Sequence, residues 1–344
     1  MASRKGKPTM FRMTHVLAIT TASVVLAAPV TAQTITVGLA LPQDVEGFDF
    51  VNGMYETFAE EVEANSDMSV SLVYGGALGS PNDRLSQMRR GTIEMTDAAD
   101  GNYATIFSDI QVLNMPYLFP TEEVAWEVLD GAFGQKLAED LREATGVRVL
   151  GWWESGGFKH FSANAEIHEP DDMSGLTMRV LGPLATIPVE ALGASSSSVA
   201  LNELYTSLQT GVVDGQDNAV SIFNMFNLGE VQSHLALTGH VYAFGPLGIN
   251  EAFFDGLEPA DQEVILEAAE AAISFNRETS RAAEADALAA ARNEGVEVIE
   301  LTDEERNAFR DVMQPPAIDW LRDNVDTPSR IDEALAAVAD VIEE

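Results

Sequence analysis

The sequence predicts an α/β protein, and three observations support this prediction. Strand-like and helix-like segments alternate from residue 35 onward, which favours a mostly parallel sheet covered by helices on both faces. Residues 260–294 contain neither Gly nor Pro and are rich in Ala and Glu, so they predict one helix about 50 Å long. The length of 344 residues is sufficient for two domains.

The elements can be placed in chain order from their hydrophobic spacing and their flanking turn residues. Expected strands cover residues 35–39, 70–74, 93–96, 147–152, 177–180 and 296–301. Expected helices cover residues 48–63, 121–144, 185–192, 204–211 and 259–294, and one more begins at Ser80-Pro81. Thr302-Asp303-Glu304-Glu305 predicts a capping box that opens a further helix. A coiled coil is the alternative for 259–294, but regular a and d heptads are missing, so a helix strapped across two domains explains its length better.

The N-terminus predicts a secretory signal peptide. Its basic residues are Arg4, Lys5, Lys7 and Arg12. An apolar run of about 13 residues, 16–28, follows and is shorter than the roughly 20 residues of a membrane span. Small residues then lead to Ala32, where we expect cleavage, so the mature protein begins near Gln33 and is periplasmic. An uncleaved membrane anchor is the alternative.

The charge balance excludes nucleic acid as a partner. The chain has 19 Lys and Arg against 55 Asp and Glu, a net charge of −36, and removal of the basic leader leaves 15 against 55. Such a surface repels nucleic acid and anionic lipid. An anionic ligand therefore has to be bound by a few local cations. Because the chain has no Cys, we expect neither a disulfide framework nor a thiolate metal site.

The signatures of common enzymes and cofactor sites do not occur in the sequence. It has no G-x-S-x-G, no H-E-x-x-H and no G-x-x-x-x-G-K. The His residues beyond the leader do not stand at metal-ligand spacing: His160, His168, His234 and His240. Residues 214–218 (DGQDN) have a calcium-like composition in the wrong order for an EF-hand, and a structural turn is the simpler interpretation. We therefore expect no enzyme activity, no cofactor and no metal.

Arg179 stands alone among apolar residues in the expected strand 177–180. A buried Arg is rare and costly unless it is paired. One interpretation is a structural ion pair with one of the many carboxylates. The other is a bidentate receptor for a ligand carboxylate, which suits the guanidinium group.

The segment that follows, 204–218, predicts a helix with Gly211 near its C-cap, then a short apolar pair and a polar turn. Polar groups at the end of a strand are where open α/β sheets bind ligands. Residues 208–218 (LQTGVVDGQDN) resemble, almost residue for residue, the hallmark of the periplasmic binding subunits of TRAP transporters, the DctP type. Similar short segments follow in the family's order along nearly the whole mature chain: 76–79 (GALG), 115–117 (MPY), 175–180 (GLTMRV), 192–194 (LGA), 230–232 (EVQ) and 238–240 (TGH).

This resemblance implies a two-lobed periplasmic binding protein, class II-like and of TRAP type, with a long helix spanning both lobes. Lobe I would comprise residues 33–156 and 244–283, and lobe II residues 157–243 and 284–344. A small carboxylate ligand would be captured between the lobes as they close. The partners would be a small DctQ-type and a large DctM-type membrane subunit.

The resemblance also assigns roles at the ligand site. Arg179 would hold the ligand carboxylate and Asn218 would hydrogen-bond to it. Lys159 stands where the family usually has a second Arg, which weakens the expectation of a second bidentate clamp. Leu181, Ser196 and Ser198 replace usual prolines, so the local loop geometry is expected to differ. Family members that bind keto acids with a metal usually have Glu-Trp near the end of the hallmark, where this chain has Asp217-Asn218, and so no metal is expected.

Further polar and aromatic residues are weaker candidates for the site. They follow expected strands or lie where two strands are expected to cross between lobes: Gln43, Asp44, Asp100, Asn102, Trp153, Glu154, His240 and Tyr242. Of the pair Trp152 and Trp153, one is expected in the core. For Glu154 and His240 a purely structural role is an open alternative.

Two functions other than transport remain open from the sequence. One is an exported enzyme acting on an acidic small molecule, and the other is a ligand-sensing module without transport. The ligand is also left open among a dicarboxylate, a sugar acid such as a uronate, and a zwitterion such as ectoine.

Overall fold

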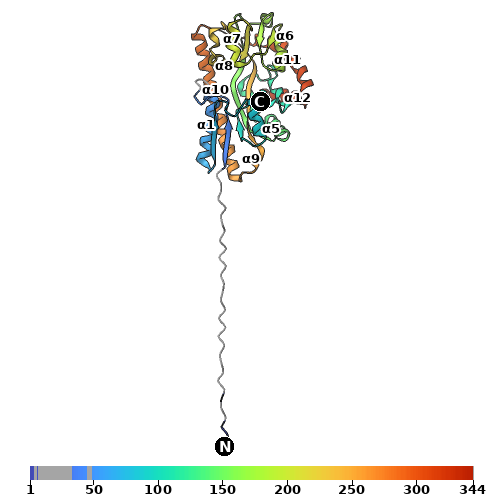
Figure 1. Ribbon diagram of the computed structural model, residues 1–344. Coiled ribbons are helices and arrows are strands. Elements are labelled where there is room, and N and C mark those ends of the chain that lie inside the picture. The colour runs from blue at the N-terminus through green and yellow to red at the C-terminus, as the bar shows by residue number, and fades with distance from the viewer. Residues whose placement is uncertain (4–5, 7–32, 45–48, 344) are drawn as a thin grey trace. The chain divides into compact units, whose positions relative to one another are not determined.

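The computed structural model describes residues 1–3, 6, 33–44 and 49–343. The predicted signal peptide, with its basic residues and apolar run, lies outside these residues, as does Phe48. By its internal contacts the chain separates into Met1–Ala32 and a compact unit of Gln33–Glu344, and only the latter is considered below (Figure 1). Among the described helices, none combines the length and the apolar character that a membrane crossing requires.

The described strands form one mixed sheet in the order β2-β1-β3-β8-β4-β7-β5-β6, with β9 paired to β8. Their bounds are β1 (Thr34–Gly38), β2 (Ser69–Val73), β3 (Met95–Thr96), β4 (Val147–Ala163), β5 (Thr177–Arg179), β6 (Ser195–Ser197), β7 (Gly215–Asn218), β8 (His234–Asn250) and β9 (Glu297–Ile299). The outer pairs are parallel, as expected, whereas β3–β8, β8–β4 and β4–β7 are antiparallel.

Two long strands, β4 and β8, join the two halves of this sheet. At its C-terminal end β8 pairs with β3 through Ile249, and at its N-terminal end it pairs with β9 through residues 234–236. The predicted strand 147–152 is therefore too short, because β4 continues to Ala163. Register shifts between Glu154 and Gly157, where Gly156 and Gly157 have φ of 91° and 84°, let the strand bend and continue.

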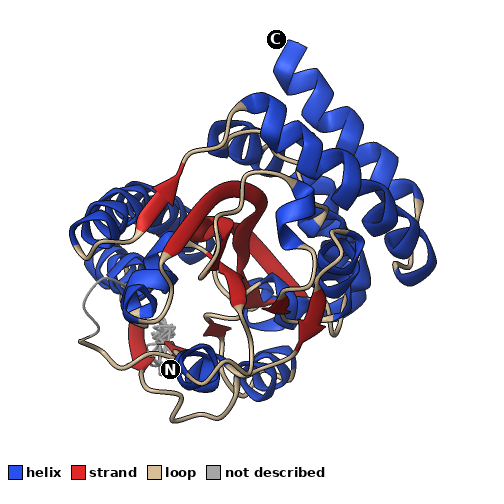
Figure 2. Cartoon of the chain, turned by 90° about the horizontal axis from the view of Figure 1, so that it is seen from above, coloured by secondary structure: helices blue, strands red, loops and turns tan. Residues whose placement is uncertain are grey.

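Helices cover both sides of the sheet (Figure 2). Their bounds are α1 (Asp49–Asn65), α2 (Pro81–Arg89), α3 (Asp100–Tyr103), α4 (Glu122–Asp130), α5 (Ala132–Thr145), α6 (Pro183–Ala191), α7 (Leu204–Gln209), α8 (Val220–Met225), α9 (Glu251–Asp255), α10 (Pro259–Asn293), α11 (Asp303–Asn324) and α12 (Ser329–Glu343). Four 3-10 turns lie between them: η1 (Ser108–Asn114), η2 (Pro170–Met173), η3 (Leu201–Glu203) and η4 (Leu228–Glu230).

The predicted helix starts at Ser80 and Thr302 are confirmed. Each forms a capping box, with Asp83 and Glu305 respectively as the third helical residue. The single helix expected over 121–144 is wrong, because the chain leaves the helical conformation at Gly131, between α4 and α5. A Cβ atom at Gly131 would lie 2.7 Å from the Glu127 carbonyl oxygen, so only Gly permits this close break. The polar turn expected at 214–218 is also wrong for its last four residues, since Gly215–Asn218 form strand β7.

The long helix α10 confirms the helix expected over 259–294 and passes from one hydrophobic core to another. Its N-terminal half contributes Ile265 and Ala272 to the core beneath α1, and α1 lies beside it in Figure 1. Its C-terminal half contributes Ala287 and Ala291 to a separate core that includes Phe223 of α8. Small Ala side chains on the buried face permit close packing along its whole length.

Candidate functional site

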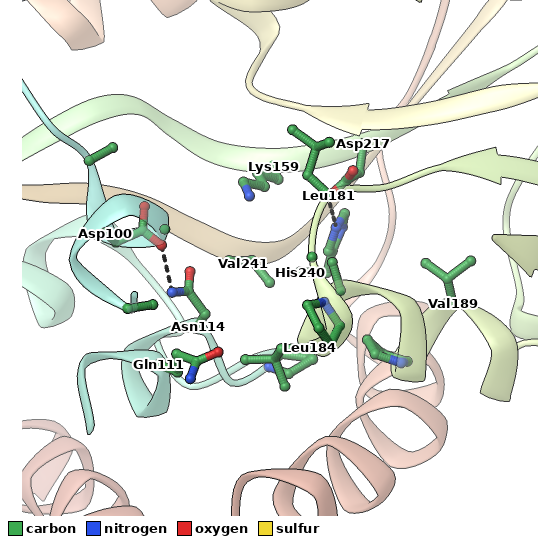
Figure 3. A pocket seen from close by; sticks show the side chains of 18 of the residues that line it. Asp100, Gln111, Asn114, Lys159, Leu181, Leu184, Val189, Asp217, His240 and Val241 are labelled. Carbon is green, nitrogen blue, oxygen red and sulfur yellow. Dashed lines mark hydrogen bonds and ion pairs between the residues drawn. The ribbon is translucent and has the colours of Figure 1, made fainter. Parts of the chain in front are cut away.

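A cavity of about 650 Å³ opens beside the two long strands (Figure 3). It lies beyond the carboxyl ends of the parallel strands β3 and β5, the position where open α/β sheets place their ligands. Its lining comes from α3, η1, β4, β7, β8, α11, α6 and the turn that leads into α6. The lining residues include Asp100, Asn102, Thr105, Gln111, Asn114, Lys159, Leu181, Pro183, Leu184, Ala185, Pro188, Val189, Asp217, His240 and Met313.

One wall of the cavity is polar and comes from α3 and η1. The Asp100 carboxylate accepts a hydrogen bond of 2.6 Å from Asn114 Nδ2, drawn dashed in Figure 3. Asn102 is held by two hydrogen bonds, donating to Asn82 Oδ1 and accepting from the Ala99 backbone N–H. The structure therefore places the predicted residues Asp100 and Asn102 at the cavity, since the chain turns into α3 directly after β3.

Lys159 reaches the cavity from the middle of β4. Successive side chains of a strand point to opposite faces, and accordingly Phe158 and His160 line a second hollow, of about 790 Å³, that does not include Lys159. Within the described part of the chain, Lys159 has neither an ion-pair partner nor a hydrogen bond. It is therefore a free cation available to a ligand.

Asp217 and His240 form a buried pair at the edge of the cavity. Their Oδ2 and Nε2 atoms are 3.7 Å apart, and the His240 ring stacks on Phe161 with a centroid distance of 4.1 Å. Burial lowers the pKa of His240, although Asp217 partly offsets this effect. Burial alone would raise the pKa of Asp217, but the His240 ring and the charges of Lys159 and Arg179 hold it below its usual value. The pair is thus a carboxylate beside a neutral imidazole at neutral pH.

Arg179 ends strand β5 and is buried, with only 2% of its surface exposed. Its Nε donates to the Val199 carbonyl at 2.9 Å, while Nη2 is buried without a hydrogen-bond partner. Burial lowers the pKa of Arg179, and Asp217 opposes the shift. Among the described residues no carboxylate lies within ion-pair distance of it, so the structural ion pair considered above is not observed.

Arg179 and Asn218 lie next to the cavity but are not among its lining residues. On β7 the neighbour of Arg179 is Gln216, and Asn218 Nδ2 donates to Gln216 Oε1 at 2.5 Å. Asp217, between the two β7 residues, does line the cavity. The structure therefore brings Lys159, Asp100, Asn102 and His240 together at the cavity, whereas Arg179 and Asn218 do not line it.

Other predicted residues lie in the core. Trp153 is 3% exposed and packs in the core of α1 and α10, so its predicted role gains no support from the cavity. The Glu154 carboxylate accepts hydrogen bonds from Ser280 (2.5 Å) and Tyr242 (2.8 Å), and Tyr242 accepts one from Trp126. Burial raises the pKa of Glu154 to about 7 despite these donors. Neither Glu154 nor Tyr242 lines the cavity.

Gln43 and Asp44 are exposed and directly precede residues 45–48, which are not described. Neither lines the cavity.

Several lining residues were not predicted from the sequence. Gln111 and Asn114 belong to η1, which has no hydrophobic periodicity to place it. Asp217 is inside the hallmark segment, and Leu181 replaces a family proline, so both positions carried a signal that could have been used.

The only group of His and acidic side chains that could hold a metal within the described residues is Glu166, His234 and Glu297. Their ligand atoms lie within 4.8 Å of one another, and His234 already approaches Glu297 at 3.5 Å. None of the three lines the cavity.

Comparisons with known proteins agree with this arrangement. Residues 48–321 match the DctP family, described as "Bacterial extracellular solute-binding protein, family 7". The C4-dicarboxylate-binding periplasmic protein DctP of Rhodobacter capsulatus is 34% identical over 267 residues, which cover 76% of this chain and 78% of that protein.

Two crystal structures show the same fold. A TRAP periplasmic solute binding protein from Ochrobactrum anthropi, with its C-terminus bound in the ligand binding pocket, is 32% identical with a TM-score of 0.84, covering 91% of this chain and 96% of that chain. The sugar acid binding protein DctPAm from Advenella mimigardefordensis, in complex with galactonate, is 30% identical with a TM-score of 0.78, covering 90% of this chain and 98% of that chain.

Proposed function

Because the chain belongs to bacterial extracellular solute-binding protein family 7, the DctP family, we propose that it is the periplasmic receptor of a TRAP transporter for a small carboxylate. The observation that carries the proposal is the cavity with Lys159 as a free cation and Arg179 buried behind it without a carboxylate partner. In a chain with a net charge of −36, unpaired cations at a cavity are suited to an anion that arrives from outside.

In this proposal Arg179 and Lys159 bind the ligand carboxylate together. The unpartnered Nη2 of Arg179 supplies the donor to the ligand carboxylate, and Nε donates to the Val199 carbonyl. Asn218 supplies a neutral donor from the neighbouring strand, and Lys159 contributes charge from β4. The Asp217–His240 pair keeps both cations in place by its negative charge.

The remaining parts of the proposal follow from the family. Lobe I is assigned to residues 33–156 and 244–283, and lobe II to 157–243 and 284–344, with β4 and β8 as the connection. The leader is removed near Ala32, and small and large membrane subunits of the transporter accept the closed, loaded form. The protein acts without catalysis and without a metal in the ligand cavity.

A thermal-shift screen of residues 33–344 against sugar acids, dicarboxylates and compatible solutes tests this proposal. A ligand at 100 times its Kd should raise the free energy of unfolding by about 2.7 kcal/mol. Calorimetry on the hits should give one site per chain. A screen without any stabilising acid would contradict the binding function, and a chemically altered acid detected by mass spectrometry would favour an exported enzyme instead.

A further inference from the structure

The cavity has two chemically different walls. The polar wall is formed by Asp100, Asn102, Thr105, Gln111 and Asn114. The apolar wall is formed by Leu181, Pro183, Leu184, Ala185, Pro188, Val189 and Met313. Figure 3 shows Asp100, Asn114 and Gln111 on one side, and Leu181 and Val189 on the other, with Asp217 and His240 beside Leu181. A ligand in this cavity therefore meets an uncharged apolar wall opposite the α3 and η1 side chains, with Lys159, Asp217 and His240 as the further polar lining groups.

Charge is also distributed unevenly around the cavity. Lys159 is the one Lys or Arg side chain among the described lining residues, and Arg179 stands behind the β5–β7 side. On the polar wall, Asp100 has Asn114 as its hydrogen-bond partner and no cation within ion-pair distance in the described chain. Of the two carboxylates that line the cavity, Asp217 thus has His240, Lys159 and Arg179 near it, whereas Asp100 has no nearby cation among the described residues to balance its charge.

A second carboxylate on the ligand would be unfavourable beside Asp100. Like charges in a partly desolvated site repel each other, and neither could be neutralised by a cation on this wall. A hydroxyl or ammonium group in the same place could donate to the Asp100 carboxylate and form a strong, charge-assisted hydrogen bond.

The apolar wall favours a ligand with one unhydrated face. Leu181 is 55% exposed, which is high for a large apolar side chain at a cavity. Contact with an apolar face of the ligand would remove this surface from water.

From these observations we propose that Asp100 determines the ligand specificity, an inference that rests on the proposed binding function. The cavity takes a monocarboxylate that has one apolar face and hydrogen-bond donors at the end away from its carboxylate. Asp100 excludes dicarboxylates.

Calorimetric titration with galactonate, ectoine and succinate tests this inference. Galactonate supplies hydroxyl donors, ectoine is a zwitterion, and succinate carries a second carboxylate. The native protein should bind galactonate or ectoine at least ten-fold more tightly than succinate. Asp100→Asn should improve succinate binding at least ten-fold and weaken the preferred monocarboxylate. Asp286→Asn, which removes one charge from the exposed face of α10, is the matched control and should change neither Kd.

A second variant keeps the test valid if Asp100→Asn does not fold. Gln111→Lys adds a cation to the same wall and should also improve succinate binding at least ten-fold. The inference would be overturned if the native protein bound succinate as tightly as it binds galactonate and ectoine. It would also be overturned if a folded Asp100→Asn protein bound succinate as weakly as the native protein does. Either result would leave the binding function standing. Absence of binding for all three acids and for the wider screen would overturn the binding function itself.

Discussion

At the scale of single residues, Arg179 is a buried charge with an electrostatic cost. Burial lowers its pKa, and it lacks a carboxylate partner among the described residues. A buried guanidinium without compensation is unfavourable, so its presence costs the empty protein stability. A ligand carboxylate that pairs with Arg179 removes this cost, and the free energy recovered adds to the binding affinity.

Substitution of Arg179 should therefore affect binding more than folding. Removing one partner of a buried charge pair costs about 3–5 kcal/mol, which is roughly two to three and a half decades in Kd. We expect this loss for Arg179→Ala, and nearly the same for Arg179→Lys, because an ammonium group cannot form two parallel bonds to a carboxylate. Lys159→Ala should lose less, since Lys159 is a flexible donor.

Affinity and the melting temperature of the empty protein should be measured on all three variants. A structural role for Arg179 makes the opposite prediction, in which Arg179→Ala melts several degrees lower and the folded fraction keeps its affinity. That result would remove Arg179 from the site.

Glu154 is a second buried ionisable residue, and it faces α10 without a cation bonded to it. Burial raises its pKa to about 7, and the charges of Glu122 and Glu284 act in the same direction. In the unfolded chain the same carboxyl has a pKa of 4.5. Between pH 4.5 and 7 the folded protein therefore binds more protons than the unfolded chain, and this group lowers the free energy of unfolding as the pH rises.

Glu154→Gln should remove this pH dependence, because an amide has the shape of the protonated acid and cannot ionise. Relative to the native protein, the variant should gain stability between pH 5 and pH 8, by about 3 kcal/mol at most. Urea unfolding at several pH values measures this difference, and Glu278→Gln, on the exposed face of α10, is the control. A constant difference across this pH range would show that Glu154 titrates normally.

The sequence predicts cavity-lining residues well where they follow a strand and poorly where a strand bends. Asp100, Asn102, Lys159 and His240 reach the cavity because strand ends and strand alternation place them there. Trp153 could not be assigned a face, because the bulges in β4 reverse the alternation of its side chains.

At the scale of elements, Asn276 fixes α10 to the rest of the protein. It is fully buried, and its side chain bonds to the backbone N–H and C=O of Glu154 in β4 and to the carbonyl of Phe50 in α1. An Asn in the middle of a helix is unfavourable by propensity alone. Its hydrogen bonds to β4 and α1 explain why it is tolerated there.

Asn276→Ala should therefore destabilise the protein although Ala is the better helix former. Loss of partners for buried backbone groups costs about 1–3 kcal/mol each, and we expect a net loss of about 2–4 kcal/mol. Denaturant unfolding measures it, with Glu270→Ala on the exposed face of α10 as the control. Equal effects of the two substitutions would show that these hydrogen bonds contribute no net stability.

Local sequence signals determine the beginnings of elements better than their lengths. Capping residues at Ser80 and Thr302 mark helix starts because the side chain bonds to the first turn itself. The length of β4 depends on its pairing with β8, about 90 residues away in sequence, and no local pattern records that pairing.

At the scale of the whole unit of residues 33–344, the strands β4 and β8 connect two halves of the sheet. Each half of the sheet has its own hydrophobic core. Glycines at positive φ interrupt β4 near the midpoint, where backbone rotation is least restricted. A few such residues can serve as a hinge between rigid bodies. The cavity lies beside this point and takes residues from both proposed lobes, Asp100 from one and Asp217 from the other.

Ligand binding should therefore compact residues 33–344. A ligand whose carboxylate is held by Lys159 and Arg179, and whose hydrogen-bond donors bind the α3 wall, favours the closed arrangement by its contacts to both lobes. Small-angle scattering with a saturating ligand from the screen should give a smaller radius of gyration than the empty protein. Arg179→Ala at the same ligand concentration should keep the empty profile. A native profile that does not change, under conditions where calorimetry shows the site is filled, would contradict closure of the lobes on binding.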